Sequence, residues 1–151
     1  KVFTCCEPIG PEHTVDELVD SVFLAIDLGL DSNAAMPRVA VPGSPMAHLG
    51  TISQERLAHI VACITLAFCN VGHPFMMVHE PSLPGLQCGA NLIMAESGSN
   101  PRDSAQDTSG HRGMDMAQCR QMLFDAGFDF LRRGNMEKIP LTAEYLQQCA
   151  D

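Results

Sequence analysis

The chain has 151 residues, which is enough for one domain with a core of its own, and 46% of them are hydrophobic. Nine Lys and Arg residues stand against 18 Asp and Glu, so the formal net charge is −9. This balance argues against a nucleic-acid-binding protein, because tracking phosphates requires a basic face. A membrane protein is not expected either, since the longest apolar stretch, 60–69, is too short to cross a bilayer.

The seven cysteines are irregularly spaced, and neither CxxC nor CxxxCxxC occurs among them. An odd number of cysteines without a disulfide-like framework is typical of a reducing compartment. No signal peptide is recognisable at the start of the sequence. We therefore predict a cytoplasmic protein in which most of these thiols are buried.

The first predicted unit is a strand, a loop and a helix. Residues 1–6 form an apolar strand, and residues 7–14, with two prolines, form a loop. Residues 15–28 repeat apolar side chains at the spacing of an amphipathic helix. Thr14 is the expected N-cap, and Glu17, three residues on, would complete a capping box.

Two further units and a last strand follow. The second unit has a strand at 36–41 and a helix that begins after Ser53. The third has a strand at 75–78 and a short helix at about 85–88, and a fourth strand is expected at 91–95. The buried side of the second helix is predicted to consist of Leu57, Ile60, Val61, Ile64, Leu66 and Phe68.

The remaining sequence is more polar. Residues 100–113 are expected to form an exposed loop, after which Asp115 caps a helix that extends through Phe124. Residues 132–140 resemble a linker, and residues 142–149 a short terminal helix.

Strands too apolar to face water on one side, separated by helices, indicate parallel βα units. Two arrangements are compatible with four such units: the C-terminal half of a (β/α)8 TIM-type barrel, or a complete four-stranded α/β domain. The abrupt start of the first strand favours the half barrel. We therefore predict a partial α/β barrel at 1–128 and a C-terminal cap, a linker with a short helix, at 129–151.

The carboxyl ends of parallel strands share one rim, where barrel enzymes carry their chemistry. Acids and imidazoles that converge there can bind a polar substrate or move protons. The rim would collect Glu7, Glu12, His13, Pro42, Gly43, Ser44, His79, Glu80 and Glu96.

Several of these residues also have a purely structural explanation. Glu12 and His13 could be first-turn residues favoured by the helix dipole, and Glu96 could accept N–H bonds of its own loop. His79 and Glu80, at a strand end before proline, are harder to explain in that way and are the stronger candidates for substrate contact. His79, Glu80 and Glu96 could also bind a metal, although their spacing does not demand one.

Four segments, in order, resemble the C-terminal half of radical S-adenosylmethionine enzymes. They are CCEPIGPEHT at 5–14, VAVPGSPMAHLG at 39–50, HEPSLPG at 79–85 and CGANLIMAESGSNPRD at 88–103. The most similar group contains biotin synthase, methylornithine synthase and the biotin-synthase-like maturase of the [Fe]-hydrogenase cofactor. The resemblance covers nearly the whole chain and weakens after about Phe128.

The resemblance implies a (β/α)8 barrel in which a [4Fe-4S] cluster cleaves S-adenosylmethionine to a 5′-deoxyadenosyl radical. That radical would abstract hydrogen from a small polar substrate. By resemblance, the residues around the adenosine are Pro8, Ile9, Gly10, Val39 and Val41. By the same argument, His79 and Glu80 face the substrate cavity, and Glu96 lies at the last barrel strand.

The sequence also departs from the family pattern. The cluster-binding CxxxCxxC is absent, and the acid after Gly10 falls at Glu12, one residue earlier than in the family's GxIxGxxE form. Residues 75–80 hold no match for the Arg that ligates a second cluster in biotin synthase. The chain is therefore expected to be inactive alone and to need an N-terminal half barrel, in the same chain or a separate one.

Two other functions remain open at this level. One is a non-catalytic subunit that completes a barrel. The other is a self-contained metal-dependent lyase or hydrolase that uses His79, Glu80 and Glu96.

Overall fold

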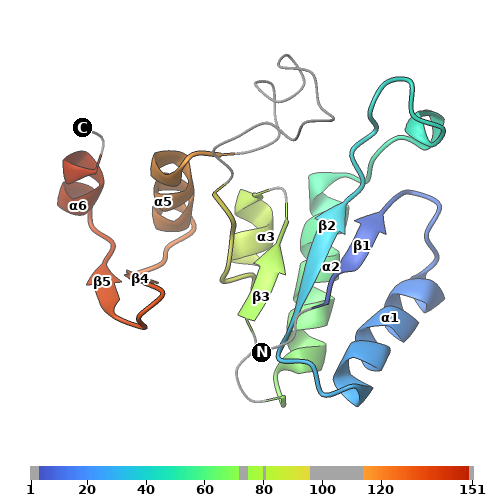
Figure 1. Ribbon diagram of the computed structural model, residues 1–151, viewed down its shortest axis with the longest axis horizontal. Coiled ribbons are helices and arrows are strands. Elements are labelled where there is room, and N and C mark those ends of the chain that lie inside the picture. Colours follow the sequence, from blue (N-terminus) through green and yellow to red (C-terminus); the bar gives the residue numbers. More distant parts are fainter. Residues whose placement is uncertain (1–3, 72–74, 80, 96–113, 150–151) are drawn as a thin grey trace. The chain divides into compact units, whose positions relative to one another are not determined.

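The computed structural model places the chain in two compact units, Lys1–Ile93 and Met94–Asp151 (Figure 1). The sequence analysis drew its boundary later, between residues 128 and 129. No helix in the described part of the chain has both the length and the apolar character needed to cross a membrane. The structure describes residues 4–71, 75–79, 81–95 and 114–149, apart from the side chain of Glu7.

The first unit is built on a parallel sheet in which neighbouring strands follow the order of the sequence. These strands are β1 (Cys6–Ile9), β2 (Ser32–Pro37) and β3 (Phe75–Val78). On the other side of β3, Leu92 forms an isolated parallel bridge with Met77. The fourth strand expected at 91–95 is thus present as a single bridge rather than as a full strand.

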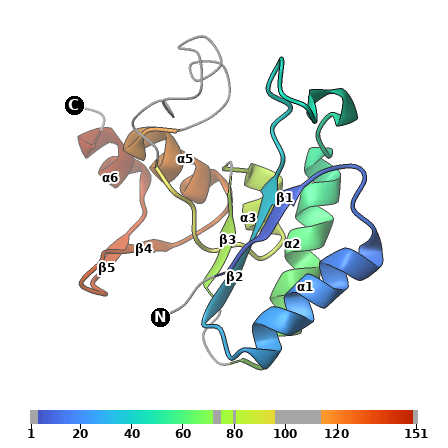
Figure 2. The same ribbon diagram turned by 45° about the vertical axis from the view of Figure 1, so that its right-hand side comes forward.

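The helices of this unit lie on one face of the sheet (Figure 2). They are α1 (Val15–Asp27), α2 (Gln54–Phe68) and α3 (Leu83–Gln87), with the short 3-10 helix η1 (Ala47–Leu49) in the connection before α2. The middle helix, α2, packs on β2 and contacts both α1 and α3. Right-handed crossovers that always step in the same direction along a sheet put their helices on the same face.

The starts of the two long helices confirm the capping predictions. The hydroxyl of Thr14 accepts the Glu17 N–H at 3.3 Å, and the Glu17 carboxylate accepts the Thr14 N–H at 2.8 Å, which is a complete capping box. The Ser53 hydroxyl accepts the Arg56 N–H at 3.2 Å at the start of α2. These contacts span three residues, so the local sequence is enough to specify them.

The first two strands begin at other positions than predicted. β1 starts at Cys6 and includes Pro8, which the sequence analysis assigned to a loop. Proline is compatible with β1 because this is the edge strand of the described sheet, and an edge position does not need every N–H. β2 starts at Ser32, four residues before the predicted strand at 36–41.

The early start of β2 depends on two buried polar residues. Ser32 donates a hydrogen bond from its hydroxyl to the Phe75 carbonyl of β3. The Asn33 side-chain oxygen accepts the Ala34 N–H at 2.7 Å. The Ser32 hydroxyl and the Asn33 oxygen are hydrogen-bonded, as buried polar groups usually are, whereas the Asn33 side-chain nitrogen has no partner among the described residues. The partner of Ser32 is 43 residues away in sequence.

Alternation along β3 distinguishes the two faces of the sheet. Val78 points toward the helices, where Gly85 of α3 lies so close that an added Cβ would be 2.9 Å from a Val78 methyl group. The register pairs Ala34 with Met77, and both of these residues lie on the opposite face. No described helix of this unit covers that opposite face (Figures 1 and 2).

Most of the predicted core of α2 is confirmed, whereas two expectations about its outer side are wrong. Leu66 is 71% exposed, and Cys63 and Cys69 are exposed thiols rather than buried ones. Cys88 is exposed as well, and of the seven cysteines only Cys6 and Cys119 are buried, so the prediction that most of the thiols are buried is wrong. The predicted residues that are buried are Leu57, Ile60, Val61, Ile64 and Phe68.

In its described residues, the second unit has two helices with a hairpin between them. They are α5 (Met116–Asp125), the antiparallel pair β4 (Phe130–Arg132) and β5 (Lys138–Pro140), and α6 (Ala143–Gln148). The prediction of a linker at 132–140 is therefore wrong, because this polar segment closes the hairpin. Asp115 and Gln118 form the second capping box of the chain, and Thr142 caps α6, both at predicted helix starts.

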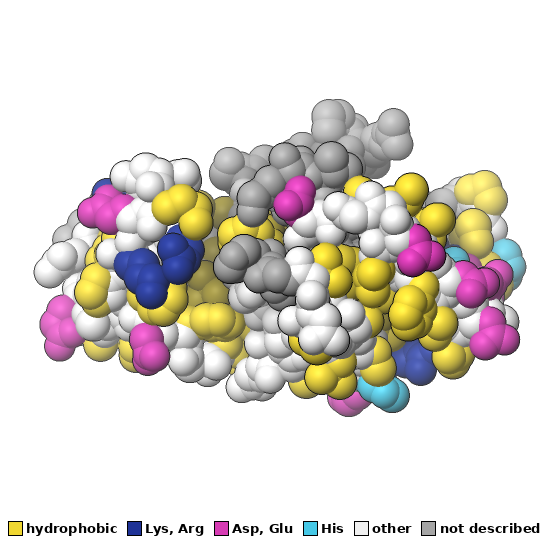
Figure 3. Space-filling view, turned by 90° about the horizontal axis from the view of Figure 1, so that it is seen from below, with side chains coloured by type: hydrophobic (Ala, Val, Ile, Leu, Met, Phe, Trp, Pro, Cys, Tyr) yellow, Lys and Arg dark blue, Asp and Glu magenta, His cyan; other side chains and the backbone are white. Residues whose placement is uncertain are grey.

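Basic side chains gather on the hairpin, where dark-blue groups are visible in Figure 3. The Lys138 ammonium lies 4.1 Å, and the Arg132 guanidinium 5.7 Å, from the centre of the Phe130 ring. Contacts of this geometry are cation–π interactions, and they hold the exposed ends of both strands together.

Candidate functional site

The first and second loops at the carboxyl edge of the sheet are joined by a bidentate ion pair. Both terminal nitrogens of Arg38 donate to the Glu12 carboxylate, and one of them also donates to the Gly50 carbonyl at 3.2 Å. The Thr51 hydroxyl donates to the Arg38 carbonyl. Because Arg38 is only 9% exposed, its charge would be costly to bury without this partner.

The ion pair also determines whether Glu12 can act as a general base. Hydrogen bonds from Arg38 lower the pKa of Glu12 to about 2, and Glu12 in turn raises the pKa of Arg38. A carboxylate that remains ionised to such a low pH is a poor general base at neutral pH. Glu12 therefore holds two loops together, and it lies before α1 rather than in its first turn.

Gly10 lies directly beneath this pair. A Cβ added to Gly10 would collide with the Glu12 carboxylate and the Arg38 guanidinium. The Gly10 N–H donates to His13 Nδ1 at 3.0 Å, and the Gly10 carbonyl accepts the His13 N–H at 3.2 Å. His13 Nδ1 also lies 3.4 Å from the Gly10 carbonyl oxygen, so the imidazole contacts both backbone polar groups of Gly10.

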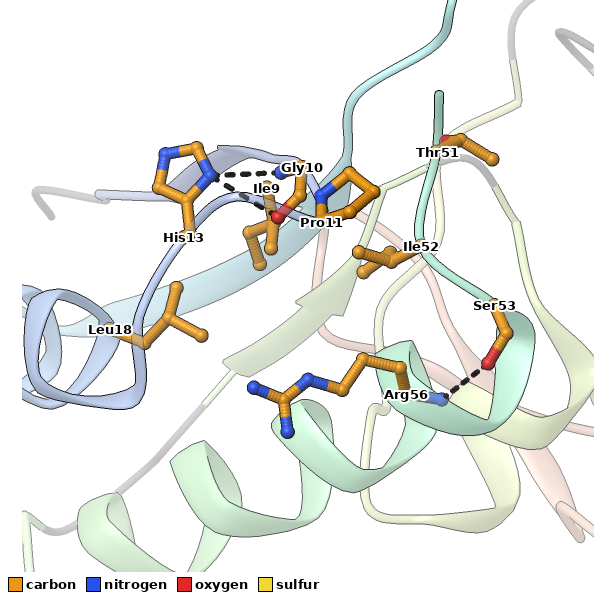
Figure 4. A pocket seen from close by; sticks show the side chains of 9 residues that line it. All are labelled: Ile9, Gly10, Pro11, His13, Leu18, Thr51, Ile52, Ser53 and Arg56. Carbon is orange, nitrogen blue, oxygen red and sulfur yellow. Dashed lines mark hydrogen bonds between the residues drawn. The ribbon is translucent and has the colours of Figure 1, made fainter. Parts of the chain in front are cut away.

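A cavity of about 270 Å³ opens beside this turn, between the first loop, α1 and the start of α2 (Figure 4). Its wall combines hydroxyl, imidazole and guanidinium groups with apolar side chains. In Figure 4, the Arg56 side chain extends from α2 toward Leu18 of α1. The residues that line the cavity are Ile9, Gly10, Pro11, His13, Leu18, Thr51, Ile52, Ser53 and Arg56.

The residues expected around an adenosine are placed as follows. Pro8 is exposed, and Ile9 is 2% exposed with its side chain lining the cavity. Gly10 already uses both of its backbone polar groups, so Ile9 and Gly10 offer a ligand mainly apolar surface. The prediction that Val39 and Val41 belong to a strand is wrong, because β2 ends at Pro37 and the Val41 N–H donates to the Val39 carbonyl at 3.0 Å in a tight turn.

His79 is the candidate substrate residue that the structure describes. It is half-buried, and its N–H donates to the Ala35 carbonyl at 2.9 Å, which extends the pairing of β3 with β2 by one residue. Glu80 and Glu96 lie outside the described residues, as does the side chain of Glu7, so the grouping of these acids with His79 stays a prediction.

Two groups at this edge were missed from the sequence. Arg38 could have been found, because it is the only Arg before residue 56 and stands in the apolar run MPRVAV, where a charge needs a partner. Ser82 could not: its hydroxyl donates to the Gln54 side chain at 2.6 Å, and that contact spans 28 residues. Ser82 is buried and connects the third loop to the start of α2.

No protein-family model, curated protein or solved structure matches the chain. The described edge therefore has to be interpreted from its own residues. It offers a rigid first loop, a polar cavity with one guanidinium, and an imidazole at the end of β3. The cavity, with its guanidinium, can bind a small polar molecule, and His79 is not among the residues that line it.

Proposed function

We propose that the chain is part of a radical S-adenosylmethionine enzyme that abstracts hydrogen from a small polar substrate in a cytoplasmic, biotin-synthase-like or cofactor-maturation reaction. The observation that carries this proposal is the order of the sheet. Three parallel strands follow one another in sequence, and their helices share one face. Consecutive βα units of a (β/α)8 barrel have this arrangement, which supports the proposal; each half of a doubly wound sheet has it too and reverses its strand order only where the halves meet.

The location of the resembling segments supports the proposal further. The EPIGPEHT segment contains the last residues of β1 and the loop after it, and HEPSLPG follows β3. Loops at the carboxyl ends of barrel strands form the active sites of TIM-type enzymes. The two segments thus lie at the edge where a barrel of this kind would bind its substrate.

The helix-free face of the sheet would form the barrel interior. It carries Ala34 of β2 and Met77 of β3, which lie side by side in the register. A barrel interior is filled by apolar side chains from its strands, and a half barrel leaves such a face to be covered by the other half. The proposed partner is therefore a cluster-bearing N-terminal half barrel, in the same polypeptide or in a separate one.

The chain's own cysteines do not fit a [4Fe-4S] cluster, which requires several thiolates within reach of one another. Among the described residues, no three Cys, His, Asp or Glu side chains gather as metal ligands would. Cluster and S-adenosylmethionine together would supply the 5′-deoxyadenosyl radical. In this chain, the Glu12–Arg38 pair would fix the loop beside the adenosine, and His79 would contact the substrate.

The first test is the coding sequence upstream of Lys1 or in a neighbouring gene. We expect a CxxxCxxC motif there, and a complete locus without one would contradict the proposal. The second test combines the chain with that half barrel under anaerobic conditions and measures 5′-deoxyadenosine by mass spectrometry. We expect its formation to require both halves. Stoichiometric divalent metal in the purified chain, with no 5′-deoxyadenosine from the pair, would instead support the lyase or hydrolase.

A further inference from the structure

The cavity beside Gly10 has an electrostatic character that the proposed function does not use. It lies on the helix side of the sheet, because its walls come from Ile9, from Leu18 of α1 and from Arg56 of α2. The proposed radical chemistry concerns the opposite, helix-free face. Ile9 and Gly10, which the resemblance places beside the adenosine, form one wall of this cavity, whereas Arg56 comes from α2. Anion binding by Arg56 can be tested whether or not the chain belongs to a radical enzyme.

Among the residues whose side chains the structure describes, no acid lines this cavity, although the chain as a whole carries twice as many acids as bases. Three acids with described side chains are adjacent in sequence to lining residues: Glu12, Glu17 and Glu55. The Glu17 carboxylate accepts hydrogen bonds from the Thr14 N–H and hydroxyl in the capping box. Glu12 is held by Arg38 in the bidentate pair. Glu55 is exposed, and its pKa is lowered by a hydrogen bond from its own backbone N–H and by one from the Ser53 hydroxyl.

Arg56 is consequently left with an unneutralised guanidinium. In the described part of the chain, no carboxylate forms an ion pair with it, whereas Arg38 has Glu12. Arg56 is half-buried in the first turn of a 15-residue helix, where the helix dipole adds to the positive potential. A partly desolvated guanidinium presents donors in a fork that matches a carboxylate or a phosphate.

The remaining wall determines what the rest of a ligand can be. Ile9, Pro11, Leu18 and Ile52 contribute apolar surface, and Thr51 and Ser53 contribute hydroxyl groups. A volume of about 270 Å³ is at the small end of ligand sites, so it suits a molecule of few heavy atoms. A bare inorganic ion would leave the apolar surface unused.

We propose that this cavity binds a small organic anion, a short-chain carboxylate or phosphate ester, whose negative group pairs with Arg56. The short apolar part of the ligand lies against Ile9 and Ile52. The turn at Gly10 forms the adjacent wall. Because the neighbouring acids bind other groups, the positive charge of Arg56 is available for the ligand.

The test is a titration of the ¹⁵N-labelled 151-residue chain, followed by amide chemical shifts. Butyrate and butyl phosphate are the probes, and butyramide, which has nearly the shape of butyrate without its charge, is the neutral control. We expect saturable shifts at Gly10, Thr51 and Arg56 with at least one anion and none with butyramide. The stronger of the two anions identifies the carboxylate or the phosphate ester as the preferred chemistry.

Substitutions then test the role of Arg56. Arg56→Gln is expected to weaken binding at least about tenfold, because a charge-assisted pair is lost. The affinity of Arg56→Lys should lie between that of the unsubstituted chain and that of Arg56→Gln, because lysine keeps the charge but not the forked donors. Arg132→Gln makes the same charge change on the exposed hairpin and should leave binding unaltered.

Three outcomes would overturn the inference: no saturable shift with either anion, equal binding of butyramide, or unchanged affinity in Arg56→Gln. Far-UV circular dichroism of each variant separates a lost site from a lost fold. If Arg56→Gln failed to fold, the comparison of butyrate with butyramide on the unsubstituted chain would still decide whether charge is required.

Discussion

The two units bury their side chains to very different degrees. In the described residues, all buried hydrophobic side chains except Cys119 and Leu141 belong to Lys1–Ile93. That unit has a sheet covered by three helices, whereas Met94–Asp151 has capped helices and an exposed hairpin held by cation–π contacts. We infer that long-range packing stabilises the first unit and that mainly local interactions shape the second.

The largest effect is expected in the core of the first unit. Phe68→Ala should lower the free energy of unfolding by about 3–5 kcal/mol, because Phe68 is fully buried and its removal leaves a cavity. Leu66→Ala, on the exposed side of the same helix, should change it by less than about 0.5 kcal/mol. Urea unfolding followed by circular dichroism measures both, and similar losses would contradict the proposed core.

A smaller effect is expected from the close approach at Gly10. Gly10→Ala should destabilise the chain by about 1–3 kcal/mol, because the new Cβ forces Glu12 and Arg38 apart. Gly134 of the second unit is the matched control, since an added Cβ meets no atom within 4 Å there. Gly134→Ala should be neutral or stabilising by up to about 1 kcal/mol. Equal effects in urea unfolding would mean that Gly10 is not crowded.

The two capping boxes test whether the units are independent. Thr14→Ala and Asp115→Ala should each destabilise their own helix by about 1 kcal/mol. Hydrogen exchange with mass spectrometry should then show faster exchange in α1 for the first variant and in α5 for the second. If either variant accelerated exchange in both helices equally, the two units would unfold together. They would then differ in structure but not in stability.

The smallest effect concerns the acid limb of stability. The folded pKa of Glu12, about 2, lies below its ordinary 4.5, so ionised Glu12 stabilises the chain fully above about pH 4.5. This contribution should disappear as the pH falls from 4.5 toward 2, and solvent screening keeps it modest. The stability difference between the unsubstituted chain and Glu12→Gln should shrink over that range.

A ¹³C carboxyl titration provides the direct measurement. Arg38→Gln should return the Glu12 midpoint toward 4.5, because Arg38 supplies the hydrogen bonds that lower it. A midpoint that is the same with and without Arg38 would show that the ion pair does not persist in solution.

The sequence was most informative where interactions are short. The starts of α1, α2, α5 and α6 and the position of β3 could be predicted, because caps and apolar runs are local signals. β2 was misplaced because Ser32 is polar and finds its partner in Phe75, far along the chain. Leu66 was misassigned because an apolar residue on a helix can equally face water.

The candidate site was less predictable than the fold. Glu12 was named among the rim acids, but its partner Arg38 is 26 residues away, and no pattern in a single sequence connects the two. The cavity depends in the same way on α1 and α2 lying side by side. His79 was expected at the end of β3 and lies there, whereas its role is a matter for the experiments above.

Pro8 has a consequence for self-association. It occupies the edge strand of the described sheet and has no N–H to offer. A strand added alongside β1 can receive no hydrogen bond from the Pro8 nitrogen, so this part of the edge is a poorer template for edge-to-edge pairing. A strand that pairs with β1 must therefore do without a hydrogen bond from Pro8, which limits the sequences that can pair at this edge.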